Sequence, residues 1–212
     1  MKVVTDVSEI ARLYDRIADP YTSCFFRSAT LRAEEAYLEE VASYLRPGAL
    51  LLDVGCGPGI EAQFFQARGF VYEGIDASPN MVRIARTKNP KGIFRTMKME
   101  NLEYPSRHFD GLIALESLIH FRKSIVPALL CEFRRVMKEG APLLLALQEG
   151  SGEGPEAFPF DPSVRVWVNR FSREELSEVL RRTGFKSLST SSRPPLAGEL
   201  SFNKLVSIAQ AS

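Results

Sequence analysis

The first 46 residues carry apolar side chains at helical spacing. They predict a short amphipathic helix over residues 8–17, which Pro20 ends soon after, and a longer helix over about 29–45, which Pro47-Gly48 ends. The apolar face of the first helix consists of Ile10, Leu13, Tyr14 and Ile17.

Short apolar runs then alternate with amphipathic segments up to residue 148. Runs that are almost wholly apolar are typical of strands buried on both faces, as in a parallel sheet. Ser78-Pro79 adds an N-cap and a first-turn proline to one of the helices between them. The predicted strands are 49–54, 71–75, 92–97, 111–115 and 142–147, and the predicted helices are 60–68, 79–88 and 125–138.

The alternation stops after Gln148. Residues 149–160 are rich in Gly, Pro and Glu and predict a loop, whereas 164–168 alternate like a half-exposed strand. A capping box at 172–175 opens a helix to about 183, and two more strands are predicted at 186–190 and 202–209. The fold class is therefore α/β, a doubly wound sheet of seven mostly parallel strands with helices on both faces.

Composition narrows the class of protein. The 212 residues are 45% hydrophobic and 25% charged with a net charge of +1, so we expect no nucleic acid or acidic membrane surface as partner. Three scattered cysteines and two histidines are too few for a zinc site, so no metal is expected. The beginning of the chain lacks an apolar leader, and no run approaches the ~20 apolar residues of a membrane span. We expect a soluble, cytoplasmic protein.

The candidate chemistry begins at the loop Asp53-Val54-Gly55-Cys56-Gly57-Pro58-Gly59. It follows the first strand of the sheet, and ligands of open α/β sheets bind at the carboxyl ends of strands. Glycines there allow a sharp turn and a close approach of a ligand to the backbone. Such a loop can also be just a tight connection.

Two carboxylates near this loop indicate which class of ligand it binds. Asp76 ends the second strand, 21 residues beyond Gly55, where a carboxylate can accept hydrogen bonds from the hydroxyls of a ribose. Asp53, just before the glycines, would repel a pyrophosphate but attract an ammonium or sulfonium group. The charges thus favour S-adenosylmethionine over a nicotinamide dinucleotide, although Asp76 can also simply cap the next helix.

At this point the sequence resembles the class I S-adenosylmethionine-dependent methyltransferases, in particular their small-molecule branch. The resemblance runs collinearly over roughly 50–209. The matching stretches include 51–59, Gly74-Ile75-Asp76-Ala77-Ser78-Pro79-Asn80-Met81, Met99-Glu100-Asn101-Leu102, Phe109-Asp110, 132–140, 171–176 and Gly184-Phe185.

The resemblance implies a cofactor site and a division of the chain. Its cofactor residues are Tyr14, Tyr21, Asp53, Gly55, Cys56, Gly57, Asp76, Ala77, Met81, Met99, Glu100, Leu115 and Glu116. Many relatives have an aspartate where this chain has Lys98, so adenine recognition is expected to rest on Glu100. One domain is expected, with an N-terminal helical lid (1–46), a cofactor-binding core (47–148), an acceptor-side excursion (149–171) and a C-terminal helix and strands (172–212).

The acceptor side is less defined. The expected substrate-binding residues are Tyr14, His120, Arg165 and Trp167. His120 is the best-placed titratable residue, but relatives often have a histidine near this position that serves packing or positioning, so no catalytic residue is assigned.

The function expected is methyl transfer to oxygen or nitrogen of a small molecule by in-line displacement, leaving S-adenosylhomocysteine. Two alternatives remain open: a non-catalytic, cofactor-binding partner subunit, and a nicotinamide-dependent oxidoreductase.

Overall fold

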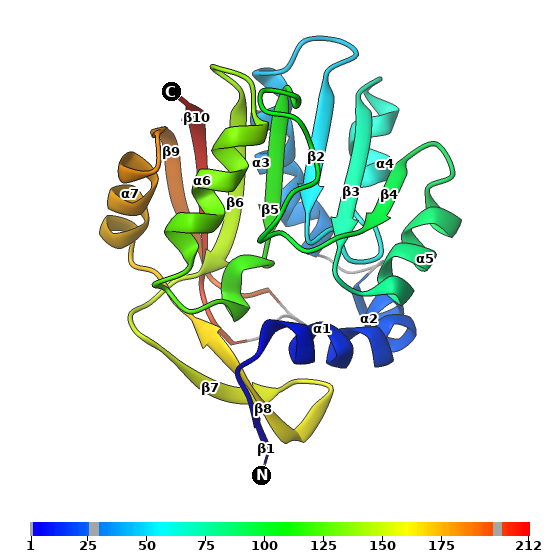
Figure 1. Ribbon diagram of the computed structural model, residues 1–212, viewed down its shortest axis with the longest axis vertical. Helices are drawn as coiled ribbons and strands as arrows, with labels where there is room; N and C mark the ends of the chain where they lie inside the picture. Colours follow the sequence, from blue (N-terminus) through cyan, green and yellow to red (C-terminus); the bar gives the residue numbers. More distant parts are fainter. Residues whose placement is uncertain (1, 26–29, 197–200) are drawn as a thin grey trace.

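The computed structural model describes residues 2–25, 30–196 and 201–212, with only the backbone for residues 30–34. Its centre is a seven-stranded sheet (Figure 1). The strands of this sheet are β2 (Leu50–Val54), β3 (Val71–Asp76), β4 (Ile93–Thr96), β5 (Gly111–Leu115), β6 (Pro142–Gln148), β9 (Phe185–Arg193) and β10 (Lys204–Ala211). In space their order is β4-β3-β2-β5-β6-β10-β9.

The sheet is parallel except for β10, which pairs antiparallel with both β6 and β9. The chain runs outward from β2 through β3 to β4 and then returns to β5 on the other side of β2. This reversal opens a crevice at the carboxyl ends of β2 and β5, where ligands of such sheets bind. The predicted doubly wound, seven-stranded sheet is confirmed.

Helices cover both faces of the sheet. One face carries α3 (Thr30–Ser43), α4 (Ala62–Ala67) and α5 (Pro79–Lys88), and the other carries α6 (Val126–Val136) and α7 (Arg173–Arg182). Fully buried side chains such as Phe65 and Phe133 fill the two layers between helices and sheet. The predicted caps form as well: the Ser78 hydroxyl accepts from the Met81 amide, and Ser172 and Glu175 complete a capping box.

The helix predicted over 8–17 is α1 (Val7–Arg16), and an unpredicted helix, α2 (Ala18–Phe25), follows it directly. Pro20 lies in the first turn of α2, because a helix does not need the amide protons of its first turn. One local prediction is wrong. The supposed loop 149–160 contains β7 (Glu153–Phe158). β7 is an edge strand, where Gly and Pro are tolerated.

A second, three-stranded sheet was not predicted. β1 (Lys2–Val4) pairs in parallel with β8 (Asp161–Asn169), and β8 pairs antiparallel with β7. This small sheet and α1 share a core of their own, formed by Val4, Ile10, Leu13, Phe158, Val164, Val166 and Val168. We call β1, α1, β7 and β8 the cap. Figure 1 shows it beside the carboxyl ends of the parallel strands.

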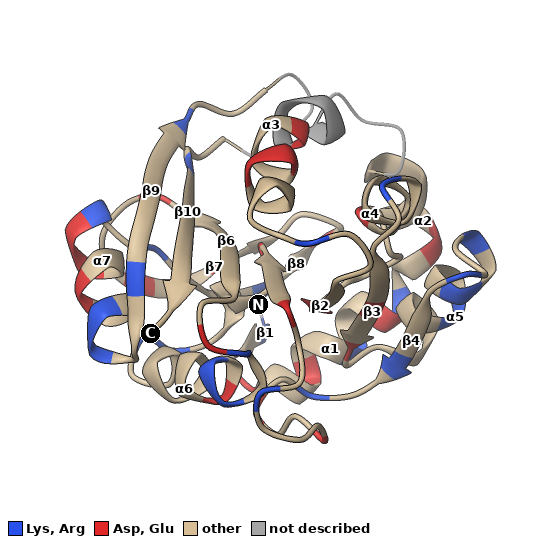
Figure 2. Cartoon of the chain, turned by 90° about the horizontal axis from the view of Figure 1, so that it is seen from above, with Lys and Arg blue, Asp and Glu red and all other residues tan. Residues whose placement is uncertain are grey.

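Charged side chains of both signs are spread over the helices around the sheet (Figure 2). Within the described ranges, no helix has the length and apolar character needed to cross a membrane. The same ranges hold no group of three or more residues arranged to bind a metal ion.

Candidate active site

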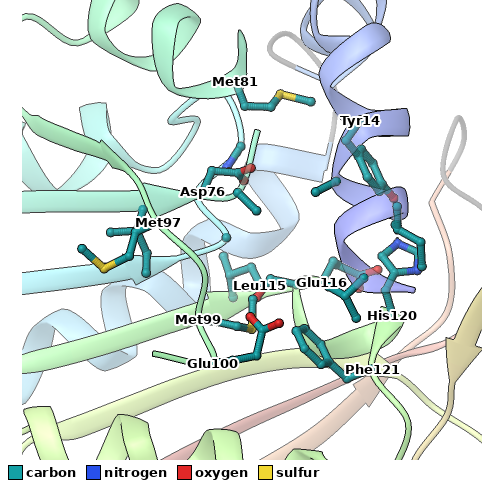
Figure 3. A pocket seen from close by; sticks show the side chains of 18 of the residues that line it. Tyr14, Asp76, Met81, Met97, Met99, Glu100, Leu115, Glu116, His120 and Phe121 are labelled. Atoms are coloured by element: carbon teal, nitrogen blue, oxygen red, sulfur yellow. Dashed lines mark hydrogen bonds between the residues drawn. The ribbon is translucent and has the colours of Figure 1, made fainter. Parts of the chain in front are cut away.

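A cavity with an empty volume of about 810 Å³ lies between the cap and the carboxyl edge of the sheet (Figure 3). This volume includes space that is open to solvent. Most of the residues predicted from the sequence line it, namely Tyr14, Tyr21, Gly55, Gly57, Asp76, Ala77, Met81, Met99, Glu100, Leu115, Glu116 and His120. The structure thus brings them together, while their individual binding roles stay predictions.

The glycine loop is held against the end of β3. The amides of Gly55 and Cys56 both donate to the Ile75 carbonyl, at 2.8 and 2.9 Å. Gly55 has a φ of +78°, and a Cβ added to it would lie 2.3 Å from the Cβ of Ser117. Gly57 also has a positive φ, of +50°, but a Cβ there would meet nothing within 4 Å. Only glycine therefore lets the loop pack against the end of β5.

Asp76 joins the loop to the helix that follows β3. Its Oδ2 accepts from the Gly57 amide at 2.9 Å, and its Oδ1 accepts from the Ser78 amide at 2.8 Å. Burial raises the pKa of this carboxyl, these two amides oppose the rise, and the charge of Asp15 adds to it. Each carboxylate oxygen can accept further hydrogen bonds, so Asp76 can hold hydroxyl groups of a ligand in the cavity that it lines.

Asp53 lies beneath the loop and does not line the cavity. It is 2% exposed, and the Tyr72 hydroxyl from the neighbouring strand donates to its carboxylate. Burial raises the pKa of Asp53 to about 7, against the effect of the Tyr72 hydrogen bond and with the help of the charge of Asp76. The attraction that the sequence assigned to Asp53 must therefore act through the loop and not by direct contact.

Three other predicted residues also stay outside the cavity. Cys56 is buried, with its Sγ donating to the Gly57 carbonyl. Arg165 donates to the Pro155 carbonyl at 2.6 Å, and the Trp167 indole donates to Glu153 at 3.2 Å. Both side chains thus bond within or beside the β7–β8 hairpin.

The charges that face the cavity are negative. Asp76, Glu100 and Glu116 line it, whereas none of its described lining residues is a lysine or arginine. Glu116 has a φ of +53°, which an ordinary residue adopts only under strain and often at a functional site. The ammonium of Lys204 lies 3.9 Å from the Glu116 carboxylate but does not line the cavity. The site therefore favours a ligand that carries positive charge.

The side chains of Tyr14 and His120 lie next to each other in the wall of the cavity (Figure 3). His120 Nδ1 lies 2.8 Å from the Trp167 carbonyl, which can only accept, so Nδ1 carries the proton. Burial lowers the pKa of His120 and raises that of Tyr14. Neutral His120 thus accepts at Nε2 from the Tyr14 hydroxyl, 2.9 Å away. Trp167 contributes to the site through this carbonyl.

Part of the lining was not predicted from the sequence. Val7, Ile10 and Ala11 line the cavity together with Tyr14, at the i, i+3, i+4 and i+7 positions of α1. Ile10 and Tyr14 belong to the predicted apolar face of this helix, but periodicity alone does not tell a core from a cavity wall. The other missed residues are Ile75, Met97, Ser117 and Phe121.

Lys98, which stands where many relatives have an aspartate, does not reach the cavity. Its ammonium donates to the Ser8 hydroxyl at 2.8 Å, near the start of α1, and the residue does not line the cavity. Glu100, two residues later, does line the cavity with its carboxylate.

Comparisons with known proteins agree with this geometry. Residues 26–190 match a family described as "Methyltransferase domain". An O-methyltransferase of Pyrenophora dematioidea is 30% identical over an alignment of 176 residues that covers 74% of this chain and 62% of that protein. The chain spans less than two thirds of the length of the first curated relatives it matches.

Solved structures share the fold. The 1,6-didemethyltoxoflavin-N1-methyltransferase of Burkholderia thailandensis, crystallised with 1,6-didemethyltoxoflavin and S-adenosylhomocysteine, has a TM-score of 0.73 at 22% identity, covering 97% of this chain and 86% of that one. The [4+2]-cyclase SpnF has a TM-score of 0.75 at 20% identity, covering 100% and 98%. The fold alone therefore does not settle the reaction.

The close approach of Gly55 to Ser117 predicts that alanine at Gly55 destabilises the protein more than alanine at Gly57. Gly57→Ala should cost about 1–2 kcal/mol of unfolding free energy, the usual penalty of a left-handed conformation. Gly55→Ala should cost clearly more, because its Cβ also overlaps Ser117. Adding Ser117→Gly should bring Gly55→Ala back to the level of Gly57→Ala. Urea unfolding of the ligand-free proteins measures this, and equal stabilities of the two single variants would show that the loop is not packed as described.

Proposed function

The chain belongs to the family of methyltransferase domains, and on that premise we propose that it transfers a methyl group from S-adenosylmethionine to a small molecule. The observation that carries the proposal is the cavity itself. A glycine loop, the carboxylate of Asp76 and two further carboxylates, Glu100 and Glu116, surround one space at the carboxyl edge of the sheet. This arrangement is suited to a ligand with ribose hydroxyls and positive charge.

The lining residues fit the parts of this cofactor. We assign the ribose to Asp76 and the adenine to Ala77, Met81, Met99 and Glu100, all of which line the cavity. The methionine end is assigned to the backbone at Gly55 and Gly57 and to the segment Leu115–Glu116. Bound S-adenosylmethionine supplies a methyl group that its sulfonium has already activated for displacement.

The protein's own task is then to exclude water, align the acceptor and take up a proton where the acceptor must lose one. α1 of the N-terminal lid closes the cavity with Val7, Ile10 and Ala11. We assign proton uptake to the Tyr14–His120 pair. An acceptor hydroxyl can donate to Tyr14, while Tyr14 passes its own proton to Nε2 of neutral His120.

The charges narrow the class of acceptor. The described lining residues include no lysine or arginine, so a carboxylate or phosphate on the acceptor would have no cation to pair with in the cavity. We therefore propose an uncharged or cationic acceptor that is methylated on oxygen or nitrogen. The similarity to an O-methyltransferase and to an N1-methyltransferase supports both atoms. Arg165, which an anionic acceptor would need, bonds to Pro155 instead.

The cofactor is tested by calorimetry with S-adenosylhomocysteine and with NAD. We expect saturable binding of the first only, and Asp76→Asn should weaken it more than tenfold, because an amide cannot accept on both sides. Asp110→Asn is the matched control. That carboxylate also accepts from a backbone amide and pairs with a lysine, but it does not line the cavity.

Catalysis is tested by incubating the protein with methyl-tritiated S-adenosylmethionine and fractionated small-molecule extract. Label in an uncharged or cationic product supports the proposal. Tight NAD binding without a response to S-adenosylhomocysteine would replace it by the oxidoreductase. Cofactor binding without any labelled product would favour a non-catalytic subunit or a reaction other than methyl transfer, as in the [4+2]-cyclase.

The Tyr14–His120 pair predicts a loss of rate without a loss of cofactor. Tyr14→Phe keeps the ring but removes the link to Nε2, so turnover of an acceptor found in this screen should fall by about 10²–10⁴-fold, the usual contribution of a general base. His120→Gln should match it. Single-turnover rates and binding of S-adenosylhomocysteine are measured for both variants. If both keep the full rate with an acceptor that loses a proton, the pair only packs.

A further inference from the structure

Asp15 of α1 is hydrogen-bonded to the beginning of α5. It lies on the side of α1 that faces away from the cap core. Asp15 Oδ1 accepts from the Ser78 hydroxyl at 2.7 Å and from the Asn80 amide at 2.8 Å. The Asn80 side-chain amide donates to Asp15 Oδ2 at 3.1 Å and to the Asp15 carbonyl at 3.3 Å. Four hydrogen bonds thus join Asp15 to Ser78, the N-cap of α5, and to Asn80 in its first turn. We call this set the clasp.

The clasp suits a carboxylate. It stands at the N-terminus of α5, where unpaired amides and the helix dipole favour negative charge. Partial burial would raise the pKa of Asp15, but the hydrogen bonds from Asn80 and Ser78 lower it below its usual value. Asp15 is therefore ionised at neutral pH, and each of its side-chain bonds is charge-assisted.

The clasp is continuous with the proposed cofactor site. Ser78 donates its hydroxyl to Asp15 and its amide to Asp76 Oδ1, at 2.8 Å. On the other side of Asp15, the adjacent residue Tyr14 lines the cavity and bonds to His120. The same turn of α1 thus carries the cavity wall and its attachment to the rest of the fold.

The two sides of α1 are attached differently. Toward the small sheet, Ile10 and Leu13 are buried in the cap core, and β1 is paired to β8 by backbone hydrogen bonds. Toward α5, Asp15 of α1 forms the clasp, while α2 adds an exposed ion pair between Asp19 and Arg83 at 3.7 Å and a small apolar contact of Ala18 with Met81 and Ile84. The clasp can break and re-form without disturbing the cap core, as can the bonds of Tyr14 to His120 and of Lys98 to Ser8.

We propose that Asp15 is a positioning residue that holds α1 closed over the cofactor, so that cofactor exchange requires the clasp to break. This rests on the proposed cofactor. The clasp contains only contacts within the protein, so it resists opening equally with the cavity filled or empty. Its loss must then speed entry and release together, whereas loss of a direct ligand contact speeds release alone.

The test is stopped-flow kinetics of S-adenosylhomocysteine with Asp15→Ala, Asn80→Ala and the double variant. We expect Asp15→Ala to raise the dissociation rate constant more than tenfold and the association rate constant in the same direction. Asn80→Ala should do so to a smaller extent, since its backbone amide remains. The double variant should exceed Asp15→Ala only slightly, because the one further bond that it removes is the 3.3 Å contact of the Asn80 side chain with the Asp15 carbonyl. Asp19→Ala, which breaks only the exposed ion pair, should leave both rates within twofold.

The outcomes separate the two proposals. No binding to the unaltered protein would overturn the cofactor assignment itself. Normal binding with unchanged rates in Asp15→Ala would overturn the clasp alone. Slower association with faster dissociation would mean that Asp15 merely supports the shape of the site, and it would also overturn the clasp. Urea unfolding checks that each variant folds, and Asn80→Ala carries the test if Asp15→Ala does not.

Discussion

The position of one carboxylate organises this site. Asp76 ends β3 and accepts from the amides of Gly57 and Ser78, so it ties the glycine loop of one β–α connection to the first turn of the next helix. The loop can come this close because Gly55 has no side chain to collide with Ser117 at the end of β5. Three strand ends are thereby fixed around one cavity, and the remaining lining residues take their places relative to them.

The cap completes the cavity from the opposite side. It has its own small core and meets the main fold largely through polar contacts: Tyr14 with His120, His120 with the Trp167 carbonyl, and Asp15 with Ser78 and Asn80. A hydrophobic interior with a polar border is suited to an element that moves as a body. Because the cap joins α1 to the β7–β8 hairpin through one core, the proposed closure of α1 over the cofactor would also move the hairpin.

The features that the sequence predicted are local ones. The glycine loop, the Ser78 cap and the capping box at Ser172 each depend on a few neighbouring residues, and each formed as expected. The missed features are pairings between distant segments. Tyr14 meets His120 across 106 positions, and β1 joins β8. Arg165 and Trp167 do share one face of a half-exposed strand, but alternation cannot tell which face meets the cavity, and here the valines of β8 occupy the core. The bond of buried Asp53 to Tyr72, which lies on another strand, could not be predicted for the same reason.

The central claim is that S-adenosylmethionine occupies the cavity between the glycine loop and α1. Hydrogen–deuterium exchange tests it directly, because ordering around a ligand slows amide exchange. With S-adenosylhomocysteine, we expect slower exchange at Gly55–Gly57, at Asp76–Met81 and along α1, and no change with NAD. Protection by NAD, or protection of neither the loop nor α1 by S-adenosylhomocysteine, would contradict the account.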